Sequence, residues 1–213
     1  DYTRVNVLKD GSGIGWSYSA ASKTLTLSSY NAGPIACDSD LNIVLNGSNT
    51  VTLPEPSQSG INVNGKLTIT KSGSSYTDTL TVKQLTTSTP ANLIVTGNAT
   101  GDSCVINGGT VNLVGASGAN GTNGIVHSAS VNNDARLNIS AGYIGVGGQL
   151  TAASSNDITI TVKGAMGGSV AARSLSASGS GMISLNANGK ATTVNSSLTV
   201  KSGAGAIALN GYT

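Results

Sequence analysis

Short segments in which an aliphatic residue alternates with threonine, asparagine or serine recur along the whole chain. The clearest of them are residues 41–45, 67–70, 80–82, 137–139 and 158–162. A period of two places the aliphatic side chains on one face of a strand and the small polar side chains on the other. Asn-Gly pairs, which suit tight corners, flank several of these segments. The pattern predicts a series of short, half-buried strands joined by corners.

The strand segments recur at a regular step, which predicts a repeating fold. A step of 26 residues separates Leu41 from Leu67, Leu67 from Leu93, and Val111 from Leu137. Repeats of this length, built from strands of a few residues, are typical of one coil of a parallel β-solenoid. We therefore predict an all-β, right-handed parallel β-helix of about six or seven coils, the hand following the general rule for parallel crossovers.

The first 33 residues differ from the rest, because they hold the only Trp and three of the six Tyr residues. The open end of a solenoid exposes strand edges and core side chains, and it needs to be covered. We predict that residues 1–33 form an N-terminal cap in which Trp16 plugs the core. Residues 34–213 are predicted to form the β-helix. The strand pattern still present at the C-terminus predicts that a further domain follows.

The composition narrows the class of protein. Only 9% of the 213 residues are charged, while 29 are Gly. Gly, Ser, Thr and Asn interrupt every stretch of helical length, so we expect no substantial helix. The net charge of +2 comes from scattered basic residues, which excludes the clustered basic surface of a nucleic-acid-binding protein. No apolar run is long enough to span a bilayer, so we expect no membrane insertion.

Four segments carry a resemblance to a known group of proteins. Residues 15–18 read Gly-Trp-Ser-Tyr, residues 23–30 contain Leu-Thr-Leu and end on Tyr, and residues 41–51 and 60–69 have the pattern of a coil. In these segments the chain resembles β-helical surface proteins of Gram-positive, clostridia-like gut bacteria, of the carbohydrate-binding-domain type. The resemblance implies a secreted protein of the cell surface or cell wall, with a polysaccharide of host or cell-wall origin as its partner.

Acidic residues are few, and only Asp38 and Asp40 form a close pair. The pair either decorates a solvated turn or contributes, with neighbouring carbonyl oxygens, to a calcium site. Ca²⁺ needs six to eight oxygen ligands, and the other aspartates fall in different loops. We expect no cofactor unless Asp38 and Asp40 bind Ca²⁺.

Isolated tyrosines are the candidates for contacts with sugar rings, because sugars stack on exposed aromatic faces. Tyr76 lies in the long excursion of residues 72–78, next to Asp78, and Tyr143 stands alone further along the chain. We expect Tyr76, Asp78 and Tyr143 to be ligand-binding residues, against the alternative that the tyrosines pack at strand edges. Tyr30 and Tyr212 are weaker candidates.

No catalytic constellation is evident in the sequence. His127 is the only histidine, and it falls in the same inward-facing column as Val63 and Cys37, so we expect it to be buried and neutral. Cys104 aligns with Ile61 in the repeat, and both cysteines are expected to be core thiols without a disulfide. We therefore predict a protein that is not an enzyme.

Adhesion or glycan binding without catalysis is the function that these observations favour. One alternative is a calcium-dependent polysaccharide lyase with Lys or Arg as its base. Others are a structural stalk or spacer and an ice-binding solenoid. Ice binding would use rows of outward threonine pairs, of which the chain has four: 24 with 26, 68 with 70, 79 with 81, and 159 with 161.

Overall fold

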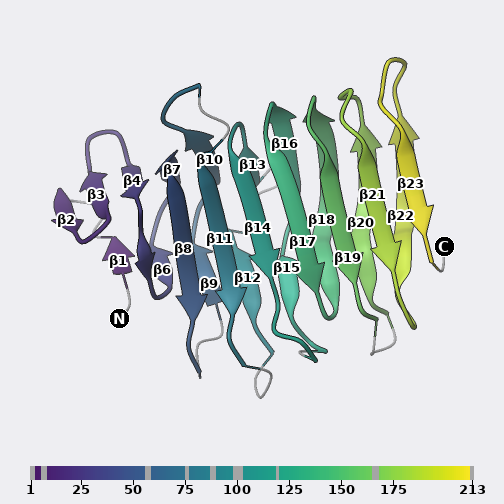
Figure 1. Ribbon diagram of the computed structural model, residues 1–213, viewed down its shortest axis with the longest axis horizontal. Helices are drawn as coiled ribbons and strands as arrows, with labels where there is room; N and C mark the ends of the chain where they lie inside the picture. Colours follow the sequence, from purple (N-terminus) through teal and green to yellow (C-terminus); the bar gives the residue numbers. More distant parts are fainter. Residues whose placement is uncertain are drawn as a thin grey trace.

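The computed structural model describes residues 3–5 (backbone only), 9–55, 59–74, 77–86, 90–97, 103–118, 120–164 and 168–211. This part of the chain is all β, with strands and no helix. The strands form a 15-stranded sheet and an 8-stranded sheet, here called sheet A and sheet B. They stack along the long axis of the molecule, with the N-terminus at one end and the C-terminus at the other (Figure 1).

Sheet A consists of two rows of parallel strands, and towards the C-terminus long strands run through both rows and join them. The first row is β1 (Thr3–Val5), β6 (Ile35–Cys37), β9 (Ser59–Val63), β12 (Asn92–Val95) and β15 (Asn123–Ile125). The second row is β4 (Thr24–Ser28), β7 (Leu41–Asn46), β10 (Leu67–Lys71), β13 (Cys104–Ile106) and β16 (Ala129–Asn133). Both rows continue in β18 (Ile144–Ser154), β20 (Val170–Ala177) and β22 (Thr192–Val200). At the edge beside β4, the short strands β3 (Trp16–Ser19) and β2 (Gly11–Gly13) pair antiparallel.

Sheet B is wholly parallel. Its strands are β5 (Asn31–Ala32), β8 (Ser48–Leu53), β11 (Thr79–Gln84), β14 (Thr110–Val114), β17 (Arg136–Ala141), β19 (Ile158–Val162), β21 (Ile183–Ala187) and β23 (Ile207–Asn210). Along the chain, a strand of the first row of sheet A is followed by a strand of the second row and then by a strand of sheet B. This order repeats, and each set of three is one coil. This topology is compatible with the predicted β-solenoid.

The predicted repeat step is right in two places and wrong in one. Leu41 pairs with Leu67, and Val111 pairs with Leu137, as the 26-residue step predicts. Leu67, however, pairs with Cys104, and Leu93 lies in β12 of the other row. The error arises because the coils differ in length: hydrogen-bonded neighbours on sheet B lie 31 residues apart between β11 and β14 but 24 between β21 and β23.

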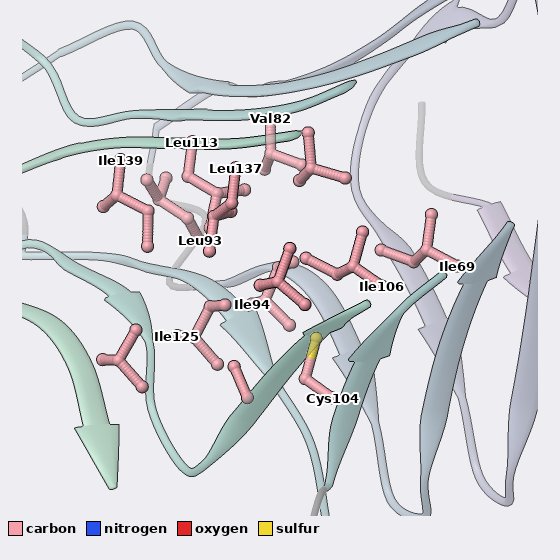
Figure 2. Packing of buried hydrophobic residues seen from close by; sticks show 14 of the residues in the cluster. Ile69, Val82, Leu93, Ile94, Cys104, Ile106, Leu113, Ile125, Leu137 and Ile139 are labelled. Atoms are coloured by element: carbon pink, nitrogen blue, oxygen red, sulfur yellow. The ribbon is translucent and has the colours of Figure 1, made fainter. Parts of the chain in front are cut away.

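The core lies between the two sheets and is filled by aliphatic side chains. Figure 2 shows Val82, Leu113 and Ile139 of sheet B facing Ile94, Ile106 and other side chains of sheet A, and all of these residues are buried. Ladders of like side chains from successive coils fill this narrow space, which explains how the fold forms without Phe.

One glycine of β18 shows how closely the chain packs around the core. A Cβ atom added to Gly145 in β18 would lie 2.2 Å from the carbonyl oxygen of Ala171 and 2.4 Å from Cγ2 of Ile160. Ala171 belongs to the next coil, and Ile160 belongs to the opposite sheet. A glycine is therefore required here by close packing against the next coil and against the opposite sheet rather than by backbone conformation.

Trp16 is not the buried plug that the sequence predicts. Its side chain is half-buried, packs on the edge of the core and lies against Gly11 and Gly13 of β2. The buried aromatic residues near this end are instead Tyr18 and Tyr30, which are 4% and 1% exposed. Tyr30 donates a hydrogen bond from its hydroxyl to the carbonyl of Gly33 at 2.9 Å and has no face open to a sugar.

The opposite end of the core is open. Leu150, Leu175 and Leu198 occupy one inward column in β18, β20 and β22. Leu150 and Leu175 are buried, whereas Leu198 is 47% exposed because β22 pairs only with β20 in the part of the chain that the structure describes.

Both cysteines are buried free thiols, as predicted. The predicted alignment of Cys104 with Ile61 is wrong, since Cys104 pairs with Leu67 and Ala129 in the second row of sheet A. Burial raises the pKa of Cys104 to about 12. His127 is half-buried, and is thus less enclosed than the expected core position.

We expect both thiols to resist modification in the folded protein. The raised pKa leaves little reactive thiolate of Cys104 near pH 8, and burial excludes the reagent. Ellman's reagent is expected to label neither cysteine in the native protein at pH 8, and both in guanidinium chloride. Rapid stoichiometric labelling of the native protein would contradict the buried positions.

The thiol of Cys104 makes the stability of the folded protein depend on pH. Its folded-state pKa of about 12 lies above the value of about 8.5 for an unfolded chain, so the folded state retains a proton that the unfolded state loses. The contribution is fully present below about pH 8.5 and falls as the pH rises towards 12. Urea midpoints at pH 8 and pH 10 measure it, and Cys104→Ala is expected to flatten the difference.

Candidate functional site

The outer face of sheet B carries small polar side chains in stacked columns. One column runs through Thr50, Thr81, Asn112, Asn138, Thr159 and Ser184, and the next runs through Thr52, Lys83, Val114, Ser140, Thr161 and Asn186. The strand alternation turns these residues outward while their neighbours fill the core. The face is therefore a regular, solvent-facing array of amides and hydroxyls.

Hydrogen bonds between coils hold these side chains in place. Asn138 Nδ2 donates to Asn112 Oδ1 at 2.9 Å, and Asn112 Nδ2 donates to Thr81 Oγ1 at 3.4 Å. In the next column, Asn186 Nδ2 donates to Thr161 Oγ1 at 3.3 Å. Each amide retains further hydrogen-bonding capacity for a ligand, because an amide offers two donors and two acceptor lone pairs.

A depression of about 490 Å³ is hollowed into this face and is here called the trough. Its lining comes from four neighbouring strands: Thr81 of β11; Asn112, Leu113 and Val114 of β14; Asn138, Ile139 and Ser140 of β17; and Thr159 and Thr161 of β19. Val114 is 40% exposed, and apolar surface makes up most of the accessible lining, with the amides and hydroxyls set within it. The trough is the candidate functional site.

The strands that form the trough carry no carboxylate side chain. None of the eight strands of sheet B contains Asp or Glu. Glycoside hydrolysis ordinarily uses two carboxylates that flank the scissile bond. The strands that form the trough supply no such pair.

The threonine pairs do not form one array. The pairs at 24/26 and 68/70 lie in sheet A, and the pairs at 79/81 and 159/161 lie in sheet B. Within sheet B, Thr81 is followed by Asn112 and Asn138 before Thr159 is reached. The regular threonine rows that ice binding would use are therefore interrupted.

Asp38 and Asp40 are both exposed, at the corner between β6 and β7. Asp40 Oδ1 accepts a hydrogen bond from the Lys66 N–H at 2.9 Å, and its Oδ2 lies 3.9 Å from Lys23 Nζ. Asp40 thus links the corner to the next coil. The residues that the structure describes include no group of three or more His, Cys, Asp or Glu side chains that could hold a metal ion.

Asp78 is buried, with 3% of its surface exposed, at the corner that leads into β11. Its Oδ1 accepts a hydrogen bond from the Gly47 N–H at 2.8 Å, while its Oδ2 is buried without a hydrogen-bond partner. A side chain in this position holds two coils together, and little of it is exposed at the surface; its expected ligand-binding role stays a prediction.

Of the predicted ligand-binding residues, the structure describes Asp78 and Tyr143, and these two do not lie together. Tyr143 is half-buried at the corner that follows β17, with its hydroxyl against Gly168 of the next coil. Asp78 precedes β11, so it lies beyond the opposite end of the sheet B strands. Tyr76 and Tyr212 lie outside the described residues.

Sequence reasoning did not identify the trough, although a signal for it was present. The alternation placed Asn112, Asn138 and Thr159 on an outer face, but their stacking depends on which coils are neighbours. A search for aromatic platforms and acid pairs also passes over a neutral amide surface.

No helix in the described part of the chain is long and apolar enough to cross a membrane. Comparisons of the chain with protein-family models, with curated proteins and with solved structures gave no match.

Proposed function

We propose that this protein is a secreted, non-catalytic glycan-binding protein of a bacterial cell surface or cell wall, and that it binds a polysaccharide in the trough. The proposal includes a right-handed β-helix of about six or seven coils, with residues 1–33 as the N-terminal cap. The observation that carries it is the hollowed row of hydrogen-bonded amides and hydroxyls on sheet B.

The side chains of the trough match the chemistry of a sugar. Sugar hydroxyls both donate and accept hydrogen bonds, as do the Asn112 and Asn138 amides and the Thr81 hydroxyl. Val114 provides an apolar contact of the kind that the C–H face of a pyranose ring can cover. A flat column of amides across several strands suits an extended polymer better than a small compact ligand.

Preorganisation supports the same conclusion. Binding costs free energy when side chains must be ordered, and a site that is already ordered avoids part of that cost. The bonds from Asn138 to Asn112 and from Asn112 to Thr81 hold the three side chains before any ligand arrives.

Removal of two amides tests the proposal. The double variant Asn112→Ala with Asn138→Ala deletes the centre of the trough but leaves the inward core side chains in place. We expect the affinity for a bound polysaccharide, measured by affinity electrophoresis and calorimetry on a panel of plant, host and bacterial-wall glycans, to fall at least tenfold.

A second amide pair offers a matched control. Asn132 Nδ2 of β16 donates to Asn107 Oδ1, in the corner after β13, at 3.0 Å, so Asn107→Ala with Asn132→Ala removes a similar amide pair outside the lining of the trough. This control is expected to bind like the unaltered protein. Equal affinity in the trough variant and the unaltered protein, or no binding to any glycan in the panel, would overturn the proposal.

A further inference from the structure

The charges on sheet B have only one sign. Among the outward-facing strand positions the charged residues are Lys83 of β11 and Arg136 of β17, and no strand of the sheet contains an acid. Both side chains are accessible to solvent, Arg136 being the more exposed. The outer face is therefore weakly but uniformly positive.

These two cations flank the trough at opposite ends of its strands. Lys83 is the register neighbour of Val114. Arg136 begins β17, two residues before Asn138 on the same outward face. A polymer lying over Asn112 and Asn138 would thus pass a cation at each side of the trough.

Neither cation is neutralised by an ion pair in the part of the chain that the structure describes. The ion pairs found there join Lys23 to Asp40 and Lys71 to Asp134. Asp134 is close to Arg136 in sequence, but its carboxylate contacts Lys71.

Two other aspartates lie near this edge. Asp157 precedes β19, and its Oδ1 accepts a hydrogen bond from the Met182 N–H at 3.2 Å. Asp78 precedes β11, where it is buried and accepts a hydrogen bond from the Gly47 N–H at 2.8 Å. Lys83 and Arg136 are therefore available to a ligand that brings its own negative charge.

We infer that the polysaccharide bound in the trough is acidic, with carboxylate or sulfate groups that pair with Lys83 and Arg136 while its sugar rings cover Val114 and the amides. This inference rests on the proposed glycan-binding function and names the class of glycan. An Arg guanidinium pairs with carboxylates and similar oxyanions through two parallel hydrogen bonds, which adds geometric selectivity to the attraction. A neutral glycan would leave both cations without a partner.

Polymers with and without charge on one backbone test the inference. Polygalacturonate and its fully methyl-esterified form differ in their carboxylates, and dextran sulfate and dextran differ in their sulfates. We expect at least one acidic polymer to bind ten times or more tightly than its neutral counterpart, with an affinity that falls as salt is raised. The pair that shows the difference identifies the anionic group.

Two double variants complete the test. The variant Lys83→Gln with Arg136→Gln is expected to lower the affinity for the acidic polymer at least tenfold. Lys66→Gln with Arg173→Gln makes the same change of charge at two exposed positions in the part of the chain that forms sheet A, and is expected to have little effect.

The outcomes separate this inference from the proposed function. Equal binding of the acidic and neutral forms in the trough would overturn the inference and leave glycan binding intact. No binding of any glycan would overturn both. Two further results would also overturn the inference. One is that polyglutamate binds as tightly as the acidic polysaccharide, and the other is that both double variants lose the same affinity. In either case, charge attraction without recognition of the sugar would explain the binding.

Discussion

Replacement of Leu150 by alanine is expected to lower the free energy of unfolding by about 2–5 kcal/mol, the usual cost of a cavity in a closely packed core. Leu150 is fully buried in β18, between Ala129 and Leu175 of the adjacent coils. The interior between the sheets is narrow, so the backbone cannot collapse readily into the space left by the lost methyl groups. Equilibrium unfolding in urea, followed by circular dichroism, measures the change.

Leu198 provides a control, because it is also a leucine and lies in the same column as Leu150. It pairs with Leu175 on one side only and is 47% exposed. Leu198→Ala is therefore expected to cost less than about 1 kcal/mol, because little apolar surface is removed from water there. Equal losses in the two variants would mean that the end of the core at β22 is covered in solution, contrary to the open end described above.

Replacement of Asn49 by alanine is expected to cost about 3 kcal/mol, because a buried hydrogen-bond network loses its centre. Asn49 is 1% exposed at the start of β8. Its Oδ1 accepts from the Tyr30 N–H at 2.9 Å, and its Nδ2 donates to the carbonyls of Gly47 at 3.0 Å and Thr79 at 3.2 Å. These bonds tie three successive coils together at one corner.

Two further variants separate hydrogen bonding from volume. Asn49→Asp keeps the shape and the acceptor but removes the donors that face the two carbonyls, so we expect a loss at least as large as that of Asn49→Ala. Asn42 is exposed and donates one hydrogen bond, to the Ser22 carbonyl at 3.1 Å, so Asn42→Ala is expected to change stability by less than about 0.5 kcal/mol. A melting temperature unchanged in Asn49→Ala would argue against the network.

Part of the candidate site followed from the sequence, and part did not. The outward positions of Asn112, Asn138 and Thr159 follow from the alternation of their strands. The expected contacts through Tyr76, Asp78 and Tyr143 rested on residue type alone. Asp78 is charged, which usually means exposure, yet the Gly47 N–H at 2.8 Å holds it inside the corner.

Trp16 illustrates the same difficulty in the predicted cap. Its large apolar ring predicted a buried plug, but β3 lies between β4 and the edge strand β2, and β2 contributes only glycine and serine residues to cover the ring. The more deeply buried rings belong to Tyr18 and Tyr30, whose positions in the coil face the core.

The alternation of aliphatic and small polar residues was enough to predict an all-β protein with parallel stacking and a core that lacks Phe, since the face of each strand depends on local spacing alone. Which residues became neighbours depended on the lengths of the corners, which vary from coil to coil. That register stacked Asn138 on Thr159, moved Cys104 beside Leu67 and set Lys83 beside Val114. A parallel strand pairs with a segment one coil away, so a single inserted corner shifts every contact that follows, and only the folded chain selects among these registers.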